Sequence, residues 1–259
     1  MAIRSKTRDQ IIAGIKKMIP IIRLQKARDV SEANTFTLVK DLLLEAFGYD
    51  KYADLTSEFT IRGTFCDLAI KINDKVSLLV EVKAIGISLA DRHVKQAVDY
   101  AANQGIEWVI LTNSVTWRLY NIIFAKPIDK KLVVEFDITE LNPKKSEALE
   151  LLYIFTKEGV QKGAHVALRD RQDATSRFML AALLLKNDRV LSVIRRELRR
   201  VVDVNVDEKE IAGILRAEVI KREPLEGPTA KEASRRVSKR KDRRLITKRT
   251  KKKPKVDLS

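Results

Sequence analysis

Three charged residues stand within two apolar stretches near the middle of the chain, at residues 64–84. Asp67 lies in TFCDLAIKI, and Glu81 and Lys83 alternate with valine in VSLLVEVKA. Carboxylate oxygens are ligands that Mg²⁺ prefers, and the backbone carbonyl of Val82 would add a third oxygen. A lysine ammonium beside them can orient a water and offset the charge of a phosphate. These residue types therefore predict metal-dependent hydrolysis of a phosphodiester.

Charges inside such apolar strands are costly to bury unless they serve a site. Side chains alternate between the two faces of a strand, so Glu81 and Lys83 share a face, and Asp67 shares one with Phe65 and Ala69. The competing interpretation is that Glu81 and Lys83 pair with each other on an exposed face. An acid followed later by E-x-K also arises by chance when 33% of the residues are charged.

The turn at residues 73–75 (Asn-Asp-Lys) decides whether the two carboxylates meet. A three-residue loop pairs Ile72 with Val76 and places Asp67 opposite Glu81. A two-residue loop sends the two acids to opposite faces. Three-residue loops usually need a residue in the left-handed conformation, which Asn or Asp can supply. We therefore predict the three-residue loop, and with it a shared face for both acids.

A helix is expected at residues 32–47, with Ser31 as its N-cap. Glu32 lies seven positions before Val39 and so falls on the inward face of this helix, whereas Glu45 points more outward. If an acid from this helix joins the metal site, we expect it to be Glu32. The alternative is that Glu32, as a first-turn acid, only complements the helix dipole.

The remaining pattern up to residue 143 alternates strands with one helix. Residues 88–104 are expected to form a helix that crosses over between strands, with Gln96 and Tyr100 on one face. From there these two side chains could contact a phosphate or hold Lys83 in place. Together with the central hairpin and an amphipathic N-terminal helix at residues 7–29, this predicts an α/β domain over residues 1–143. Further strands are expected at 56–62, 108–112, 115–123 and 131–138.

Charge and composition exclude several classes of protein. The 259 residues carry a net charge of +16, and residues 228–259 hold fourteen Lys or Arg against three Asp or Glu. A single Cys excludes an intrachain disulfide and a thiolate metal site, and two His argue against a His-rich zinc site. We find no apolar run long enough for a membrane helix and no signal peptide, so we expect a cytoplasmic protein.

Beyond residue 143 the pattern changes to helices and then to a basic tail. Residues 144–222 are expected to form a small helical region, and residues 223–259 a disordered tail. Basic clusters in both would bind nucleic acid through its phosphates, without sequence preference; targeting and plain solvation are the alternatives. The expected nucleic-acid-binding residues are Arg195, Arg196, Arg199, Arg200, Arg235, Arg236, Lys239, Arg240 and Lys241.

Five stretches, in a fixed order over residues 31–121, carry a resemblance to a known family. They read SEANTFTLVKDLLLEAFGYD, CDLAI, LLVEVKA, HVKQAVDYAANQG and WVILTNSVTWRLYN. Their order and spacing resemble the N-terminal nuclease domain of the restriction (R) subunit of type I restriction-modification enzymes, which belongs to the PD-(D/E)XK nuclease superfamily. The resemblance implies a restriction-endonuclease-like core, in which a mixed sheet is flanked by helices.

The resemblance also implies an activity and places residues in roles. The motif positions fall on Glu32 for the helix acid, on Asp67, Glu81 and Lys83 for the catalytic motif, and on Gln96 and Tyr100 for the auxiliary Q-x-x-x-Y motif. Cys66 stands where the superfamily has a proline before the first acid. The implied activity is that of a Mg²⁺-dependent DNA endonuclease of restriction or defence type.

The clearest departure from that family is the missing motor. The sequence contains no G-x-x-x-x-G-K-[ST], the phosphate-binding loop of ATPases, so we expect that it does not translocate DNA by itself. It would act alone, as a homodimer, or with restriction-modification partner subunits. The second hypothesis is a non-catalytic nucleic-acid-binding or assembly protein that keeps the nuclease fold. The full set of motif residues favours the nuclease.

Overall fold

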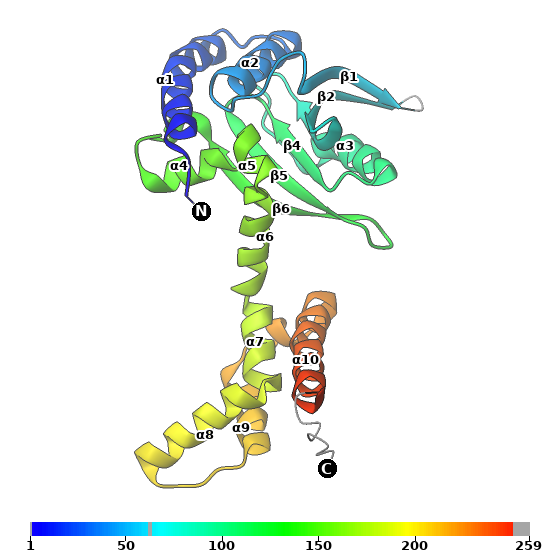
Figure 1. The fold of residues 1–259 in the computed structure, drawn as a ribbon. Helices are drawn as coiled ribbons and strands as arrows, with labels where there is room; N and C mark the ends of the chain where they lie inside the picture. Colours follow the sequence, from blue (N-terminus) through cyan, green and yellow to red (C-terminus); the bar gives the residue numbers. More distant parts are fainter. Residues whose placement is uncertain (1, 62–63, 251–259) are drawn as a thin grey trace, which may run out of the picture. The chain divides into compact units, whose positions relative to one another are not determined.

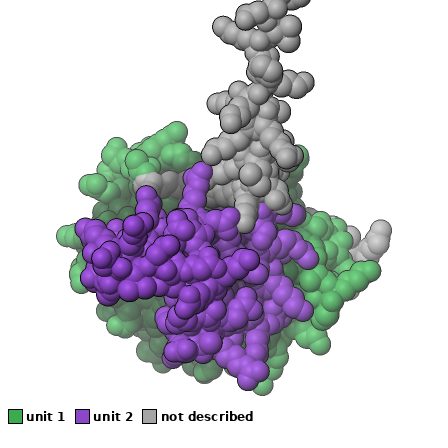
Figure 2. All heavy atoms as spheres, turned by 90° about the horizontal axis from the view of Figure 1, so that it is seen from below, with its two compact units in different colours: residues 1–168 green, residues 169–259 purple. Residues whose placement is uncertain are grey.

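The structure is a computed structural model that describes residues 2–61 and 64–250, without the side chains of residues 58–65 and 240–250. The chain divides into two compact units, coloured separately in Figure 2: unit 1 is residues 1–168 and unit 2 is residues 169–259. Each unit is considered by itself below.

Unit 1 is built on a mixed six-stranded sheet with the strand order β1-β2-β3-β4-β5-β6 (Figure 1). Neighbouring strands are antiparallel except β3 and β4, which are parallel. A parallel pair needs a crossover, and α3 (Asp91–Gln104) supplies it. The expected α/β fold class is confirmed. The strands are β1 (Leu55–Ile61), β2 (Thr64–Ile72), β3 (Lys75–Val82), β4 (Trp108–Thr112), β5 (Thr116–Ile123) and β6 (Asp129–Asp137).

Helices cover both faces of this sheet and create two separate cores. On one face α3 packs over a cluster that includes Ala69 and Leu79. On the other face Trp117 is fully buried, with its ring 5.5 Å from that of Phe47 and 5.7 Å from that of Phe155. Each such edge-to-face pair adds about 0.5–1.5 kcal/mol to the burial of the rings. The helices of this second face are α1 (Ser5–Ala27), α2 (Glu32–Glu45), α4 (Ser146–Tyr153) and α5 (Lys157–Gln161).

The turn between β2 and β3 differs from the one predicted. Ile72 pairs with Lys75, so the loop has two residues, and the prediction of a three-residue loop is wrong. Both loop residues are left-handed, with φ of 51° at Asn73 and 62° at Asp74. Asn and Asp tolerate this conformation better than other non-glycine residues, and two such residues in sequence suit a tight hairpin.

A β-bulge restores the register that the short turn would have lost. Lys71 pairs with Val76, but Ile70 pairs with Leu78, so Ser77 is an extra residue on β3. Beyond the bulge the pairing continues to Leu68 and Val80. The next positions along these two strands are Asp67 and Glu81. The two acids therefore share a face, as predicted, although for a different reason.

Unit 2 contains only helices among its described residues. The C-terminal segment differs from the prediction, because α10 (Gly227–Thr250) is a helix in the region expected to be disordered. Ala230 and Ala233, three residues apart, are buried, and α10 packs on α7. Residues 251–259 of the predicted tail lie outside the described residues. The other helices here are α7 (Arg177–Lys186), α8 (Asp188–Val202), α9 (Glu208–Ile214) and the short turns η2 (Leu215–Val219) and η3 (Glu223–Leu225).

The segment between the sheet and these helices is also helical. The short turn η1 (Ile138–Glu140) follows β6, and α6 (Ala164–Ala174) spans the boundary at residue 168. Leu152 and Phe155 are buried in the core of unit 1, so this unit extends past the domain boundary predicted at residue 143. Within residues 2–61 and 64–250, no helix is long and apolar enough to cross a membrane.

Candidate active site

Asp67 and Glu81 lie on adjacent strands and on the sheet face that α3 covers. Ala69 and Leu79, two positions away along each strand, belong to the α3 core, and alternation puts the two acids on the same side. The backbone N–H of Val82 donates a 2.7 Å hydrogen bond to Oδ2 of Asp67. The Glu81 residue is only 6% exposed. The fold therefore places two largely buried carboxylates beside each other.

Lys83 connects this pair of acids to helix α2. Its Nζ donates a 2.7 Å hydrogen bond to Oε1 of Glu81 and lies 3.8 Å from Oε1 of Glu32. Its backbone N–H bonds the carbonyl of Thr112 on β4, which fixes the chain as it leaves β3. Glu32, at the first position of α2, keeps about half of its side chain exposed, at 53%. The structure thus brings together side chains from α2, β2 and β3.

The electrostatics of the three residues reflect their burial. Burial raises the pKa of Glu81 to about 7, and the charge of Asp67 adds to this, while the hydrogen bond from Lys83 opposes it. Burial also raises the pKa of Asp67 above its usual value, against the bond from Val82. Burial lowers the pKa of Lys83, but the bond and charge of Glu81 outweigh it and raise the pKa overall. For both acids, burial thus outweighs the hydrogen bonds that favour the ionised carboxylate.

The donors at this place suit a divalent cation with oxygen ligands. The carboxylates of Asp67 and Glu81 and the carbonyl of Val82 are hard oxygen donors, which fit Mg²⁺ with the remaining positions filled by water. No group of three or more Asp, Glu, His or Cys side chains in the described part of the chain is arranged to hold a metal. The ion pair of Glu32 is with Lys83. Glu45, a further acid of this helix, is 2.8 Å from Lys17 instead.

The two motif residues of α3 lie in different surroundings. Tyr100 is 2% exposed and belongs to the core cluster that contains Cys66, whereas Gln96 is exposed. Burial raises the pKa of the Tyr100 hydroxyl and raises that of the Cys66 thiol to about 12. Four residues on a helix are slightly more than one turn, so Gln96 and Tyr100 point in directions about 40° apart. This difference is enough for one to face the sheet and the other the solvent.

Thr35 and Asn113 support the site but were not predicted from the sequence. Thr35 Oγ1 accepts the N–H of Ile85, and Asn113 Nδ2 donates to the carbonyls of Ile85 and Ile87, at 3.0, 3.3 and 2.9 Å. Both side chains are buried. They hold the segment after Lys83, beyond the end of β3. The available signal was a polar residue on the apolar face of a helix, and an Asn directly after a buried strand.

The predicted basic residues of α8 lie largely on its surface. Arg196, Arg199 and Arg200 are exposed, and Arg195 is half-buried. Arg195 Nε lies 3.8 Å from Oε1 of Glu208, and an Nη2 of Arg200 lies 2.7 Å from Oε2 of Glu197. Exposed ion pairs of this kind contribute little to stability, so these cations stay available to a polyanion.

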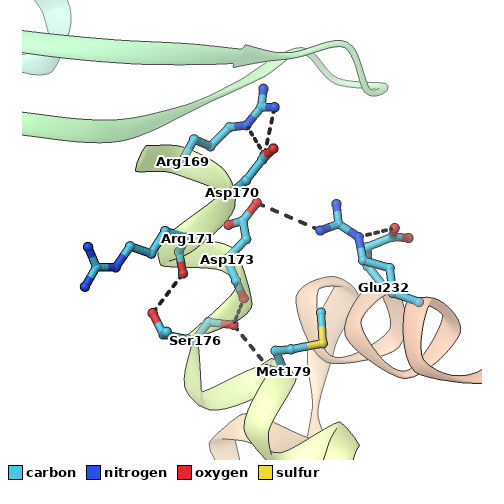
Figure 3. Close-up of polar contacts among 9 residues, drawn as sticks. Arg169, Asp170, Arg171, Asp173, Ser176, Met179 and Glu232 are labelled. Atoms are coloured by element: carbon cyan, nitrogen blue, oxygen red, sulfur yellow. Dashed lines mark hydrogen bonds and ion pairs between the residues drawn. The ribbon is translucent and has the colours of Figure 1, made fainter. Parts of the chain in front are cut away.

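Some of the predicted basic residues of α10 form ion pairs with neighbouring acids. Arg236 Nε donates to Glu232 at 3.2 Å, and its Nη1 lies 4.0 Å from Asp173 of α6. Figure 3 labels the two acids, Asp173 and Glu232. Arg235 and Lys239 are exposed. The side chains of Arg240 and Lys241 lie outside the described part of the structure.

Comparison with known proteins gives one match. Residues 38–132 match the family model described as the type I restriction enzyme R protein N terminus. No curated protein and no solved structure matches the chain. The matched segment contains Asp67, Glu81 and Lys83 and does not contain Glu32 or unit 2. The resemblance inferred from the sequence is thereby confirmed: over residues 38–132, the chain is similar to the N terminus of the type I restriction enzyme R protein.

Proposed function

We propose that the protein is a Mg²⁺-dependent endonuclease of restriction type that hydrolyses phosphodiester bonds in DNA. The observation that carries this proposal is the pair Asp67 and Glu81, a half-buried and a buried acid on one sheet face, with the Lys83 ammonium 2.7 Å from Glu81. Burying like charges this close together is costly, and such pairs occur where they serve a site. The pair lies in the segment that is similar to the restriction enzyme R protein.

Each residue has a proposed role. Asp67, Glu81 and the carbonyl of Val82 would hold the metal, with Glu32 as an additional acid at its edge. A bound Mg²⁺ would polarise the phosphate and lower the pKa of a water. Lys83 would direct its ammonium at the attacking water or at the phosphate. Val82 N–H fixes the Asp67 carboxylate, and Glu32 fixes the ammonium of Lys83. Gln96 would contact a phosphate from the surface of α3, and Tyr100 would hold α3 on the sheet.

DNA is the proposed substrate and the basic residues of unit 2 are its proposed anchors. Lysine and arginine side chains that neutralise phosphates release counterions, which favours binding without sequence preference. The sequence carries no phosphate-binding loop for ATP. We propose that restriction-modification partner subunits supply whatever translocation the reaction needs, and that a homodimer would bring together the two sites that double-strand cleavage needs.

A second function has a specific observation in its favour. The 2.7 Å bond between Lys83 and Glu81 gives both charges a partner without any metal. A nucleic-acid-binding or assembly protein that keeps the fold could use this pair as a structural contact alone. Such a protein would bind DNA and leave it intact.

Plasmid cleavage tests the proposed function. Supercoiled and linear DNA are incubated with Mg²⁺ or with a chelator, using the wild type, Lys83→Ala and, as control, Lys75→Ala. Lys75 is exposed and begins β3, whereas Lys83 directly follows the end of that strand, so the loss of Lys75 removes the same charge at the opposite end of β3. We expect nicking that needs Mg²⁺ and falls about 10²–10⁴-fold in Lys83→Ala alone. Binding without cleavage by the wild type would contradict the nuclease and favour the second function.

A further inference from the structure

A second set of polar side chains lies at the start of α3, on the sheet face that holds Asp67 and Glu81. Arg92 and His93 are the second and third residues of this helix. Burial lowers the pKa of His93, as do the positive charges of Arg92, of Lys83 from β3 and of Arg118 from β5, while Glu32 from α2 opposes them. His93 therefore lies in positive surroundings, at the start of the helix that covers this face of the sheet.

The hydrogen bonds of the imidazole determine where its proton lies. Nδ1 of His93 accepts the backbone N–H of Ala90 at 3.1 Å. A nitrogen that accepts a hydrogen bond carries no proton, so the neutral ring has its proton on Nε2. The opposite tautomer would set an N–H of the ring against the N–H of Ala90. His93 therefore presents a donor at Nε2.

Arg92 directs a second hydrogen-bond donor toward Nε2 of His93. Its Nε lies 3.2 Å from Nε2 of His93, and an arginine Nε always carries a proton. Although this distance suits a hydrogen bond, two N–H groups cannot bond each other. Both would be satisfied by one acceptor oxygen placed beside them. In the described part of the chain, Arg92 has no ion pair with a carboxylate, and its side chain is exposed to solvent.

We propose that Arg92 and His93 bind a phosphate oxygen of the nucleic-acid strand, next to the phosphate that reacts at Asp67, Glu81 and Lys83. A phosphodiester oxygen is an acceptor that carries negative charge, which suits two converging donors among cations. Contacts of this kind fix the position of the strand without reading its sequence. This inference rests on the proposed function for the identity of the neighbouring phosphate.

Equilibrium binding of a short labelled DNA duplex tests the contact in the full chain, in chelator, over a series of salt concentrations. The variants are Arg92→Ala and His93→Glu, and Arg8→Ala is the matched control. Arg8 is exposed on α1, which packs on the other face of the sheet. His93→Glu keeps an acceptor for the Ala90 N–H, since Glu at this helix position closes a capping box. Thermal unfolding of each variant verifies that the helix start is intact.

We expect Arg92→Ala and His93→Glu to weaken binding about three- to tenfold at low salt, and Arg92→Ala to reduce the salt slope by about one. Arg8→Ala should keep the wild-type affinity and slope. Wild-type affinity in both α3 variants, or an equal loss in Arg8→Ala, would overturn the inference.

The plasmid assay separates this inference from the proposed function. If the wild type cleaves DNA and the α3 variants bind as it does, the phosphate contact is wrong and the nuclease stands. If the wild type does not cleave but the α3 variants lose affinity, the nuclease is wrong and the phosphate contact stands.

Discussion

The two units treat charge in opposite ways. Unit 1 buries charged groups: Glu81 in the sheet is 6% exposed, and Asp54, directly before β1, is also 6% exposed with Lys157 2.7 Å away. Unit 2 keeps its charges on the surface: residues 169–259 hold 27 Lys or Arg against 14 Asp or Glu, a surplus of 13 out of the net +16. Buried charges can be tuned for chemistry, and exposed ones attract a polyanion. This difference agrees with the proposed reaction in unit 1 and the proposed DNA binding by unit 2.

The cores of the two units also differ, in the size of the side chains that they bury. Unit 1 buries large side chains on both faces of a sheet, including Trp117 at 0% exposure. In unit 2 the buried apolar side chains are mostly alanines, such as Ala182 and Ala230, while Val201 is 74% and Val219 64% exposed. Burial of apolar area is the main stabilising contribution, so unit 1 is the more stable part.

The largest expected effect on stability comes from a substitution in the core of unit 1. Trp117→Ala removes a ring that contacts Phe47 and Phe155, and we expect a loss of about 3–5 kcal/mol in the free energy of unfolding. Urea titration followed by circular dichroism measures it. A loss below about 1 kcal/mol would mean that unit 1 does not depend on this core.

Removing exposed charge from unit 2 should affect binding and not folding. A triple variant with Arg196, Arg199 and Arg200 changed to Gln should bind duplex DNA about ten- to hundredfold more weakly at low salt, with a salt slope reduced by up to about three. Fluorescence anisotropy measures both quantities. An unchanged salt slope would show that α8 does not contact phosphates. As controls, the positions at which DNA is cut and the thermal stability of the variant should match those of the wild type.

The buried acid of unit 1 should lower stability in the absence of metal. Burial raises the pKa of Glu81 from 4.5 to about 7 in the folded chain. Between pH 4.5 and pH 7, the folded chain therefore keeps a proton on Glu81 that the unfolded chain has lost. The metal-free wild type should therefore lose stability as pH rises from about 4.5 through about 7. Glu81→Gln should remove this loss and be about 1–2 kcal/mol more stable at pH 8, and equally stable at pH 4.

Denaturant titrations at both pH values check this prediction, with cleavage measured in parallel. A Gln variant that is more stable yet inactive would show that Glu81 is kept for function at the expense of stability. If the wild type gains stability between pH 5 and pH 8 relative to Glu81→Gln, favourable interactions outweigh the cost of burying the charged Glu81 carboxylate, and the prediction fails.

The smallest effect concerns the exposed apolar side chains of unit 2. Val201→Ala, at a position 74% exposed, should change the free energy of unfolding by less than about 0.5 kcal/mol. A loss above about 1.5 kcal/mol at micromolar protein that disappears on dilution would show that a partner chain covers this position.

Local patterns predicted most of the sheet, because alternation and apolar runs determine strands directly. They did not predict the turn, since Asn73 and Asp74 fit two loop lengths and the bulge at Ser77 depends on how both faces pack. The helix α10 was missed because its stability comes from Ala230 and Ala233 packing on α7, a contact distant in sequence. The different surroundings of Gln96 and Tyr100 likewise depend on how α3 rests on the sheet.

Metal binding by the chelator-treated protein tests the central claim most directly. Calorimetric titration with Mn²⁺ is performed at pH 8, where Glu81 is ionised, on the wild type, on Asp67→Asn and on the control Asp99→Asn, an exposed acid of α3. The account predicts a metal site in the wild type and in Asp99→Asn that is lost in Asp67→Asn. Equal binding by all three proteins, or none by the wild type, would contradict it.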